Sequence, residues 1–214
     1  MLSQHRTDSR LGDFGISLLA AGKSADETVS EVCNSTNDIE WRQIGALDAK
    51  GQGSVYHGRR MYSIYTHSIG ADCLALGNIL ANDQITRSMA NAFVANPDLP
   101  LGERLMRALE AGSAAGGEIK GPLRSAAVRV TGEHGIDALD LRVDISERTA
   151  VDDLRRLVDA YANRAEILRD VALNPDGIPV MRSLFDASIA RIEELGLQDR
   201  FTTARNRDSW ALRD

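Results

Sequence analysis

The sequence has few cysteines, prolines and aromatic residues, and it has no excess of positive charge. Its 214 residues include two cysteines and five prolines, and 5% of them are aromatic. So few cysteines exclude a disulfide framework, and no paired Cys or His spacing predicts a zinc site, so both thiols are expected to be free. The formal net charge of −6 argues against a nucleic-acid partner, because phosphate binding needs clustered Lys and Arg.

Long hydrophobic runs are also missing. No segment approaches the roughly 20 apolar residues that a membrane span needs, and the opening MLSQHRTDSR has no apolar core like that of a secretory signal. We therefore expect no membrane partner and a cytoplasmic location. A hydrophobic fraction of 43% is ordinary for a globular protein of this length, which can bury a sizeable core.

The first half of the chain predicts two helices followed by strands. Apolar residues recur at helical spacing over 10–22, and Ser24 with Glu27 has the pattern of a capping box that opens a second helix. From about residue 42 the composition changes to frequent glycines with β-branched and aromatic residues. This composition predicts four strands, at 42–48, 53–58, 61–68 and 71–79.

The second half predicts helices and strands in blocks. Helices are expected after Asn82 and from Leu101, then strands at 124–132 and 137–144, a helix at 150–170 and a last helix that ends at Gly196. On the 150–170 helix we expect a solvated charged face, formed by Asp152, Asp153, Arg155 and Arg156. Because helices and strands do not alternate strictly, a layered α+β fold is favoured over a doubly wound parallel sheet.

Several motifs occur in one order: WRQIGALDAKG, then YHG, then GNILAN, then LxERLMxALEAGSAAGGE and RSAAV. Over roughly residues 7 to 175 the chain resembles the bacterial family called domain of unknown function 1028. The resemblance implies an αββα sandwich of the N-terminal-nucleophile (Ntn) hydrolase type, with two antiparallel sheets between helical layers. The domain would cover 1–175, and 176–214 would add a C-terminal helix and a polar tail.

Two departures from the family pattern change the expectation. Family members normally open with two further β segments that start near a Thr or Ser, whereas this chain begins with Met1 and Leu2, so the expected fold is N-terminally shortened and has no terminal nucleophile. His57 stands in YHG where the family commonly has a threonine. A sheet edge left open by missing strands invites pairing with another copy, which predicts a homodimer or larger homo-oligomer.

The residues and the resemblance together give two functional hypotheses. The first is an amidohydrolase acting on a small amide-containing metabolite, and the alternative is a non-catalytic small-molecule-binding or scaffold protein on the same fold. No cofactor and no metal are expected. The catalytic candidates are His57 as base or binder, Asn78 as oxyanion donor and Glu118 as an orienting carboxylate. The substrate-binding candidates are Arg124, His67 and Gly117. Each candidate retains a structural alternative, such as a satisfied core amide or a turn glycine.

Overall fold

The computed structural model describes residues 1–132, 135, 137–162, 164–174, 180–201 and 212–213. The chain forms two compact units, Met1–Tyr161 and Ala162–Asp214. The first unit ends before the domain boundary expected at residue 175, a position outside the described residues. We treat each unit by itself, and the candidate site lies in the first.

A three-stranded antiparallel sheet opens the first unit. Its order is β1-β2-β3, formed by β1 (Leu2–His5), β2 (Arg42–Leu47) and β3 (Gly53–His57). Helices α1 (Ser9–Ala20) and α2 (Ala25–Asn34) and a short 3₁₀ helix (Ile39–Trp41) join β1 to β2. The predicted capping box of Ser24 and Glu27 is present, and buried Val32 and Ile44 belong to the core shared by the helices and the sheet.

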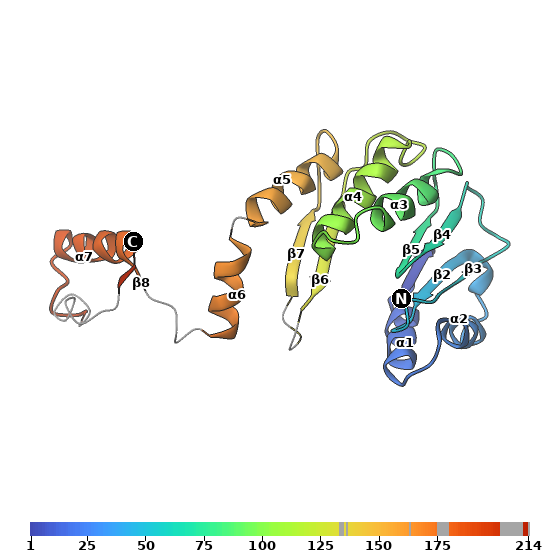
Figure 1. Cartoon of the computed structure of the whole chain (residues 1–214), viewed down its shortest axis with the longest axis horizontal. Coiled ribbons are helices and arrows are strands. Elements are labelled where there is room, and N and C mark those ends of the chain that lie inside the picture. Colours follow the sequence, from blue (N-terminus) through green and yellow to red (C-terminus); the bar gives the residue numbers. More distant parts are fainter. Residues whose placement is uncertain (133–134, 136, 163, 175–179, 202–211, 214) are drawn as a thin grey trace. The chain divides into compact units, whose positions relative to one another are not determined.

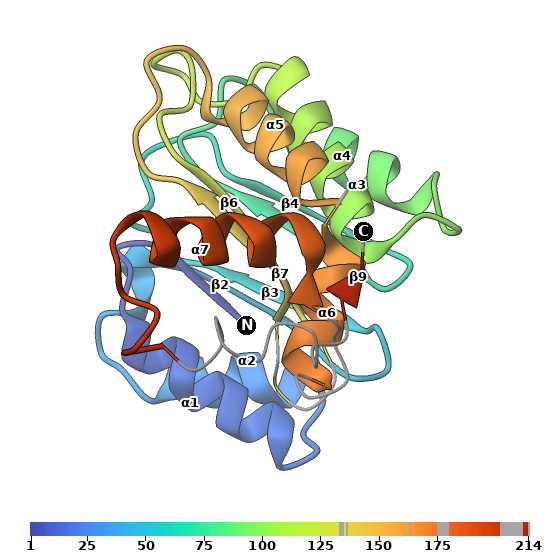
Figure 2. The same cartoon turned by 90° about the vertical axis from the view of Figure 1, so that its left-hand side faces the viewer.

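A two-stranded antiparallel sheet follows, formed by β4 (Thr66–Gly70) and β5 (Cys73–Gly77). Helices α3 (Ile85–Val94) and α4 (Leu101–Ala114) come next, and α3 packs on both strands. A β-carbon at Gly45 of β2 would lie only 3.0 Å from the Leu74 side chain and 3.2 Å from Leu76, so β2 and β5 face each other closely. The two small sheets therefore lie between α1 and α2 on one side and α3 and α4 on the other (Figures 1 and 2).

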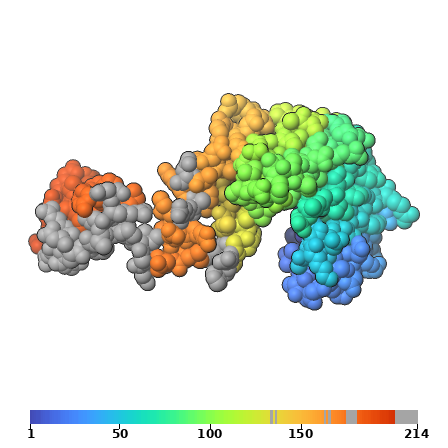
Figure 3. All heavy atoms as spheres, viewed as in Figure 1, coloured from blue at the N-terminus to red at the C-terminus, as the bar shows by residue number. Residues whose placement is uncertain are grey.

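This arrangement confirms the α+β class with small antiparallel sheets. The N-terminal helices and helices α3 and α4 form opposite faces of the first unit in the space-filling view (Figure 3). No helix in the described part of the chain is long and apolar enough to cross a membrane. Cys33 and Cys73 are both free thiols, as predicted.

A hairpin and one more helix complete the first unit. The strands β6 (Ala126–Thr131) and β7 (Asp137–Val143) pair antiparallel, and α5 (Ala150–Ala162) follows them. Their core contains Met106 of α4 and Leu154 of α5, both fully buried. Apolar faces of two helices and two strands thus meet around one cluster.

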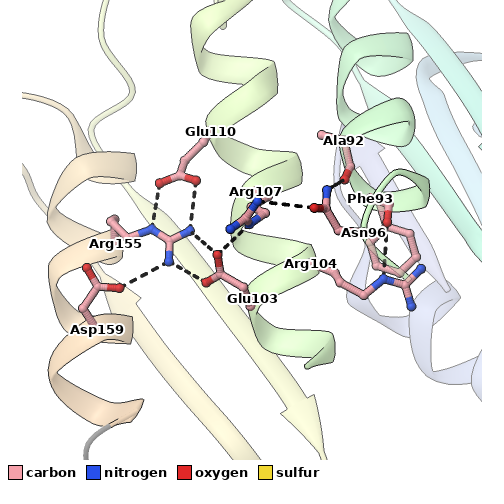
Figure 4. A network of polar contacts seen from close by, with 9 residues as sticks. All are labelled: Ala92, Phe93, Asn96, Glu103, Arg104, Arg107, Glu110, Arg155 and Asp159. Atoms are coloured by element: carbon pink, nitrogen blue, oxygen red, sulfur yellow. Dashed lines mark hydrogen bonds and ion pairs between the residues drawn. The ribbon is translucent and has the colours of Figure 1, made fainter. Parts of the chain in front are cut away.

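The prediction that Arg155 lies on a solvated helix face is wrong. Its side chain is 21% exposed and reaches from α5 to α4, where Nε and Nη2 donate to the two carboxylate oxygens of Glu110 at 2.7 and 2.9 Å. Its Nη1 also donates to Glu103 at 2.6 Å and to Asp159 at 3.3 Å (Figure 4). The i,i+4 pair with Asp159 is present, but the interhelical pairs dominate because two carboxylates of α4 face the same guanidinium.

The second unit contains α6 (Ala165–Leu173), β8 (Val180–Met181), α7 (Arg182–Glu194) and β9 (Leu212–Arg213). The two short strands pair in parallel, and Phe185 and Ile189 of α7 are buried. Most of the predicted polar tail, residues 202–211 and 214, lies outside the described residues.

Two further predictions need correction, and one strand of the first unit has no counterpart among the predicted elements. The helix expected at 150–170 is two helices, α5 ending at Ala162 and α6 beginning at Ala165, and Arg164 before α6 has non-helical dihedral angles, with φ −123° and ψ −7°. The strand expected at 61–68 begins only at Thr66; the Ile64 carbonyl and the Ser63 hydroxyl before it accept hydrogen bonds from the loop after β5 instead of a strand partner. Strand β1 was not predicted at all.

Candidate functional site

Strand pairing places a row of polar residues across the first sheet. Gln43 of β2 lies opposite Gln4 of β1 on one side and opposite His57 of β3 on the other. Residues in register on neighbouring strands project to the same face, and residues two apart on one strand share that face. Gln43 therefore shares the face of Gly45, which packs against β5, and its side chain is fully buried.

The buried Gln43 amide is the centre of a hydrogen-bond network. Its Nε2 donates to the Gly77 carbonyl at 2.9 Å and lies 3.2 Å from His57 Nδ1, with the Thr66 carbonyl farther away at 3.4 Å. Its Oε1 accepts from Asn78 Nδ2 at 3.3 Å. Both ends of the amide are satisfied, as a buried polar side chain requires.

His57 and His67 form a direct pair. His57 Nε2 lies 2.8 Å from His67 Nδ1, and the ring centroids are 5.0 Å apart. His57 is half-buried, whereas His67, at the start of β4, is exposed. Burial lowers the pKa of His57, and the neighbouring His67 lowers it further, so the imidazole is neutral at neutral pH.

Asn78 holds the network together rather than offering a free donor. Its Nδ2 donates to Gln4 Oε1 at 3.1 Å as well as to Gln43, so both of its N–H groups have partners in the described structure. The next residue, Ile79, has a φ of +58°, an unusual conformation for a β-branched side chain that costs of order 1–3 kcal/mol. The Ser63 hydroxyl accepts from Ile79 N at 3.0 Å and fixes this bend.

Glu118 and Gly117 reach the same region through the backbone. Leu80 and Glu118 form an isolated antiparallel bridge, and the Gly117 carbonyl accepts from Ala81 N at 3.0 Å. Gly117 has a φ of +59°, which an L side chain rarely adopts, so a glycine suits this turn. The Glu118 side chain is exposed beside the loop that follows Asn78.

Arg124 belongs to a different surface. It is exposed just before β6, and its carbonyl accepts from Ser146 N at 2.8 Å. The structure therefore brings His57, His67 and Asn78 into one network, places Glu118 and Gly117 on the adjacent loop, and gives Arg124 no described contact with that network.

Sequence reasoning missed Gln4 and Gln43, the two amides that connect the network. The sequence gives only a weak signal for Gln43, a polar residue two positions before Gly45 in RQIGAL, where Arg42 is polar as well. Without β1 in the prediction, no partner for Gln4 was visible. Among the described residues, no three His, Cys, Asp or Glu side chains gather as a metal site would require.

A separate cavity of about 480 Å³ has no histidine in its lining. Its lining comes from β5, α3, α4 and β6 and is mainly apolar, with Cys73, Phe93 and Leu105 among the residues and Asp72 and Arg129 as charged ones. Ligand sites normally combine such apolar surface with a few convergent polar groups. The histidine network has the polar groups and this cavity has the volume, so they are two distinct candidate sites.

Taken together, these features define a layered α+β protein with a buried amide and histidine network between its sheets. The family described as "Family of unknown function (DUF1028)" has a model that matches residues 1–154. The chain therefore belongs to this family of unknown function.

A solved structure agrees with this assignment. The crystal structure of protein SPO2555 from Silicibacter pomeroyi, described with the same family, is similar with a TM-score of 0.67 and 26% sequence identity. The match covers 76% of this chain and 75% of that chain. No curated protein matches the sequence at a significant level.

Proposed function

We propose that the chain is an Ntn-hydrolase-like protein that hydrolyses an amide bond of a small metabolite at the histidine pair. The observation that carries the proposal is the continuous hydrogen-bonded series from buried Gln43 through His57 to exposed His67. The imidazole of His67 faces solvent, and hydrogen bonds through His57 and Gln43 hold it in place. Many enzymes hold a catalytic side chain in this way, through hydrogen bonds to neighbouring residues.

The proposed reaction adds water across the amide. The water oxygen bonds to the carbonyl carbon, the C–N bond breaks, and the nitrogen takes up a proton, so the products are a carboxylic acid and an amine. His67 contacts the reacting group, His57 supports it, and Asn78 acts as a positioning residue through Gln43. Glu118, exposed on the adjacent loop, orients a charged part of the substrate, while roles for Gly117 and Arg124 stay predictions.

The test is hydrolysis of a panel of N-acyl amino acids and simple amides by the full chain, followed by quantifying the released amine. We expect turnover in the wild type and a loss of about 10² to 10³-fold in His67→Gln, the range for removing one hydrogen-bond donor to a developing oxyanion. Arg142→Gln is the control, because Arg142 is 71% exposed on β7. Equal turnover in His67→Gln and Arg142→Gln would refute the site.

A second candidate function is binding without catalysis, and the apolar cavity favours it. A volume of about 480 Å³ suits a small apolar ligand. The test is thermal stabilisation by a panel of small apolar carboxylic acids and amides. Ala108→Leu would fill the cavity, since Ala108 lines it, and should abolish the stabilisation. Stabilisation that survives Ala108→Leu would exclude this cavity as the binding site.

Self-association is part of the proposal. Each of the pairs β4–β5 and β6–β7 forms a two-stranded sheet in the described structure, so each of these four strands has one edge without a strand partner. Such edges pair readily with strands of another copy. Light scattering at micromolar concentration should give the mass of a dimer or larger assembly, and a monomer mass would contradict this proposal.

A further inference from the structure

The orientation of the Gln43 amide is fixed by two independent partners. Its Nε2 lies 2.9 Å from the Gly77 carbonyl, which can only accept, and its Oε1 lies 3.3 Å from Asn78 Nδ2, which can only donate. Rotating the amide by 180° would set oxygen against oxygen and nitrogen against nitrogen. Because the side chain is fully buried, no water can compensate for those lost hydrogen bonds.

This orientation decides which nitrogen of His57 carries the proton. One hydrogen of Gln43 Nε2 goes to the Gly77 carbonyl, and the other points to His57 Nδ1 at 3.2 Å, nearer than the 3.4 Å to the Thr66 carbonyl. His57 Nδ1 is then an acceptor, so the neutral ring carries its hydrogen on Nε2. The partner of one ring nitrogen sets the state of the other.

The same logic extends one ring further. His57 Nε2 donates to His67 Nδ1 at 2.8 Å, which makes that nitrogen an acceptor and leaves the hydrogen of His67 on its own Nε2. Since His67 is exposed, this N–H is the group that the pair can offer to a ligand. A ligand that accepts it must present an oxygen or nitrogen lone pair.

We propose that Gln43 is a positioning residue that fixes the tautomers of both histidines, so that the pair presents the Nε2–H of His67 to a carbonyl oxygen of the ligand. This inference rests on the proposed site and deepens the proposed function. In amide hydrolysis negative charge develops on the carbonyl oxygen, and a fixed neutral donor stabilises that charge. His67 is then a donor to the substrate rather than a base.

The geometry also disfavours a proton on His57. A protonated ring would carry hydrogens on both nitrogens, and its Nδ1–H would face the N–H of Gln43. The lowered pKa of His57 agrees with this argument.

The experiment is two-bond ¹H–¹⁵N correlation NMR of the histidine side chains in the labelled full chain at neutral pH. Signals of His57 and His67 are assigned with His57→Gln and His67→Gln. We expect both rings to show an unprotonated Nδ1 and a protonated Nε2. A protonated Nδ1 on His57, or exchange-averaged nitrogens on both rings, would overturn the inference.

A variant pair then tests the role of Gln43 itself. Gln43→Glu replaces the N–H donor by an acceptor, so we expect His57 to gain a hydrogen on Nδ1. Gln52→Glu is the matched control on an exposed glutamine and should leave the spectrum unchanged. A folded Gln43→Glu protein with wild-type tautomers would refute the positioning role, and if this variant does not fold, the wild-type tautomers alone decide.

Acetamide is the probe for the ligand class, because it carries a carbonyl oxygen and no charge. Titration should shift the Nε2–H resonance of His67 and leave the ring signals of His5 unchanged, since His5 Nδ1 donates to the Trp41 carbonyl and its Nε2 is buried. No shift of His67 at saturating acetamide would overturn the assignment of a carbonyl ligand. The predicted tautomers without turnover in the hydrolysis panel would instead contradict only the proposed function.

Discussion

Replacing Arg155 by methionine should destabilise the first unit measurably, because this arginine ties α5 to α4. Its side chain is 21% exposed, and its carboxylate partners Glu103 and Glu110 are 26% and 38% exposed. Exposed ion pairs contribute about 0–1 kcal/mol, whereas breaking a buried pair costs about 3–5 kcal/mol. A half-buried, bidentate pair lies between these limits, so we expect a loss of about 2 kcal/mol.

The assay is thermal and urea unfolding of the full chain followed by circular dichroism. A loss of about 2 kcal/mol corresponds to a fall of about 4–8 °C in the unfolding midpoint for a chain of this size. Arg156→Met on the same helix is the control, because Arg156 is 60% exposed, and its effect should stay within about 0.5 kcal/mol. If the two variants lose the same stability, Arg155 does not join the helices as described.

Three further predictions follow from other parts of the first unit. Burial, and then the charge of Glu40, raise the pKa of the Cys33 thiol to about 11. Alkylation of Cys33 at pH 8 should therefore be much slower in the native chain than in urea. Equal alkylation rates would contradict the burial of this thiol. Because the pKa of His57 is lowered on folding, the unfolded chain binds the extra proton first, and stability should fall as pH drops below about 6.5. The fall should be smaller in His57→Gln, as measured by urea midpoints between pH 7.5 and 5. Gly58→Ala should lower the free energy of unfolding by about 3 kcal/mol or more, because its β-carbon would lie 2.3 Å from the Glu40 carbonyl oxygen. Gly12→Ala, in α1 with open space around it, should leave the stability unchanged or raise it by up to about 1 kcal/mol. A Gly58→Ala protein as stable as wild type would show that the backbone there can move apart.

Sequence patterns predicted the helices and strands that are determined by residues close together in the sequence. The capping box at Ser24 and Glu27 and the alternation along β7 are set by neighbours in the sequence, and both appear in the structure. Strand β1 is different, because LSQH becomes a strand only by pairing with β2, which lies some forty residues later. Its four residues carry too little pattern to reveal that pairing.

The candidate site likewise combines residues that sequence patterns select with contacts that only the folded chain forms. His57, His67 and Asn78 were selected by residue type, and their meeting depends on two sheets facing each other. Gln43 joins them, but a glutamine in a strand reads as an ordinary solvent-facing residue unless the opposing sheet is known. Likewise, the interhelical role of Arg155 needed the distance between α4 and α5, which periodicity within one helix does not contain.

The formation of the network between the sheets also depends on the completeness of folding. Gln4 and Asn78 are 74 positions apart, and Gln43 and Asn78 are 35 apart, so the amides meet only after long stretches of chain have closed. Contacts of such long range form slowly, since the chain must lose the entropy of loop closure before these contacts can stabilise the fold. A partly assembled form would enclose amides without partners, at a cost of about 1–3 kcal/mol each. Such a form would be short-lived, and the histidine pair would serve as a reporter of chains that have reached their final state.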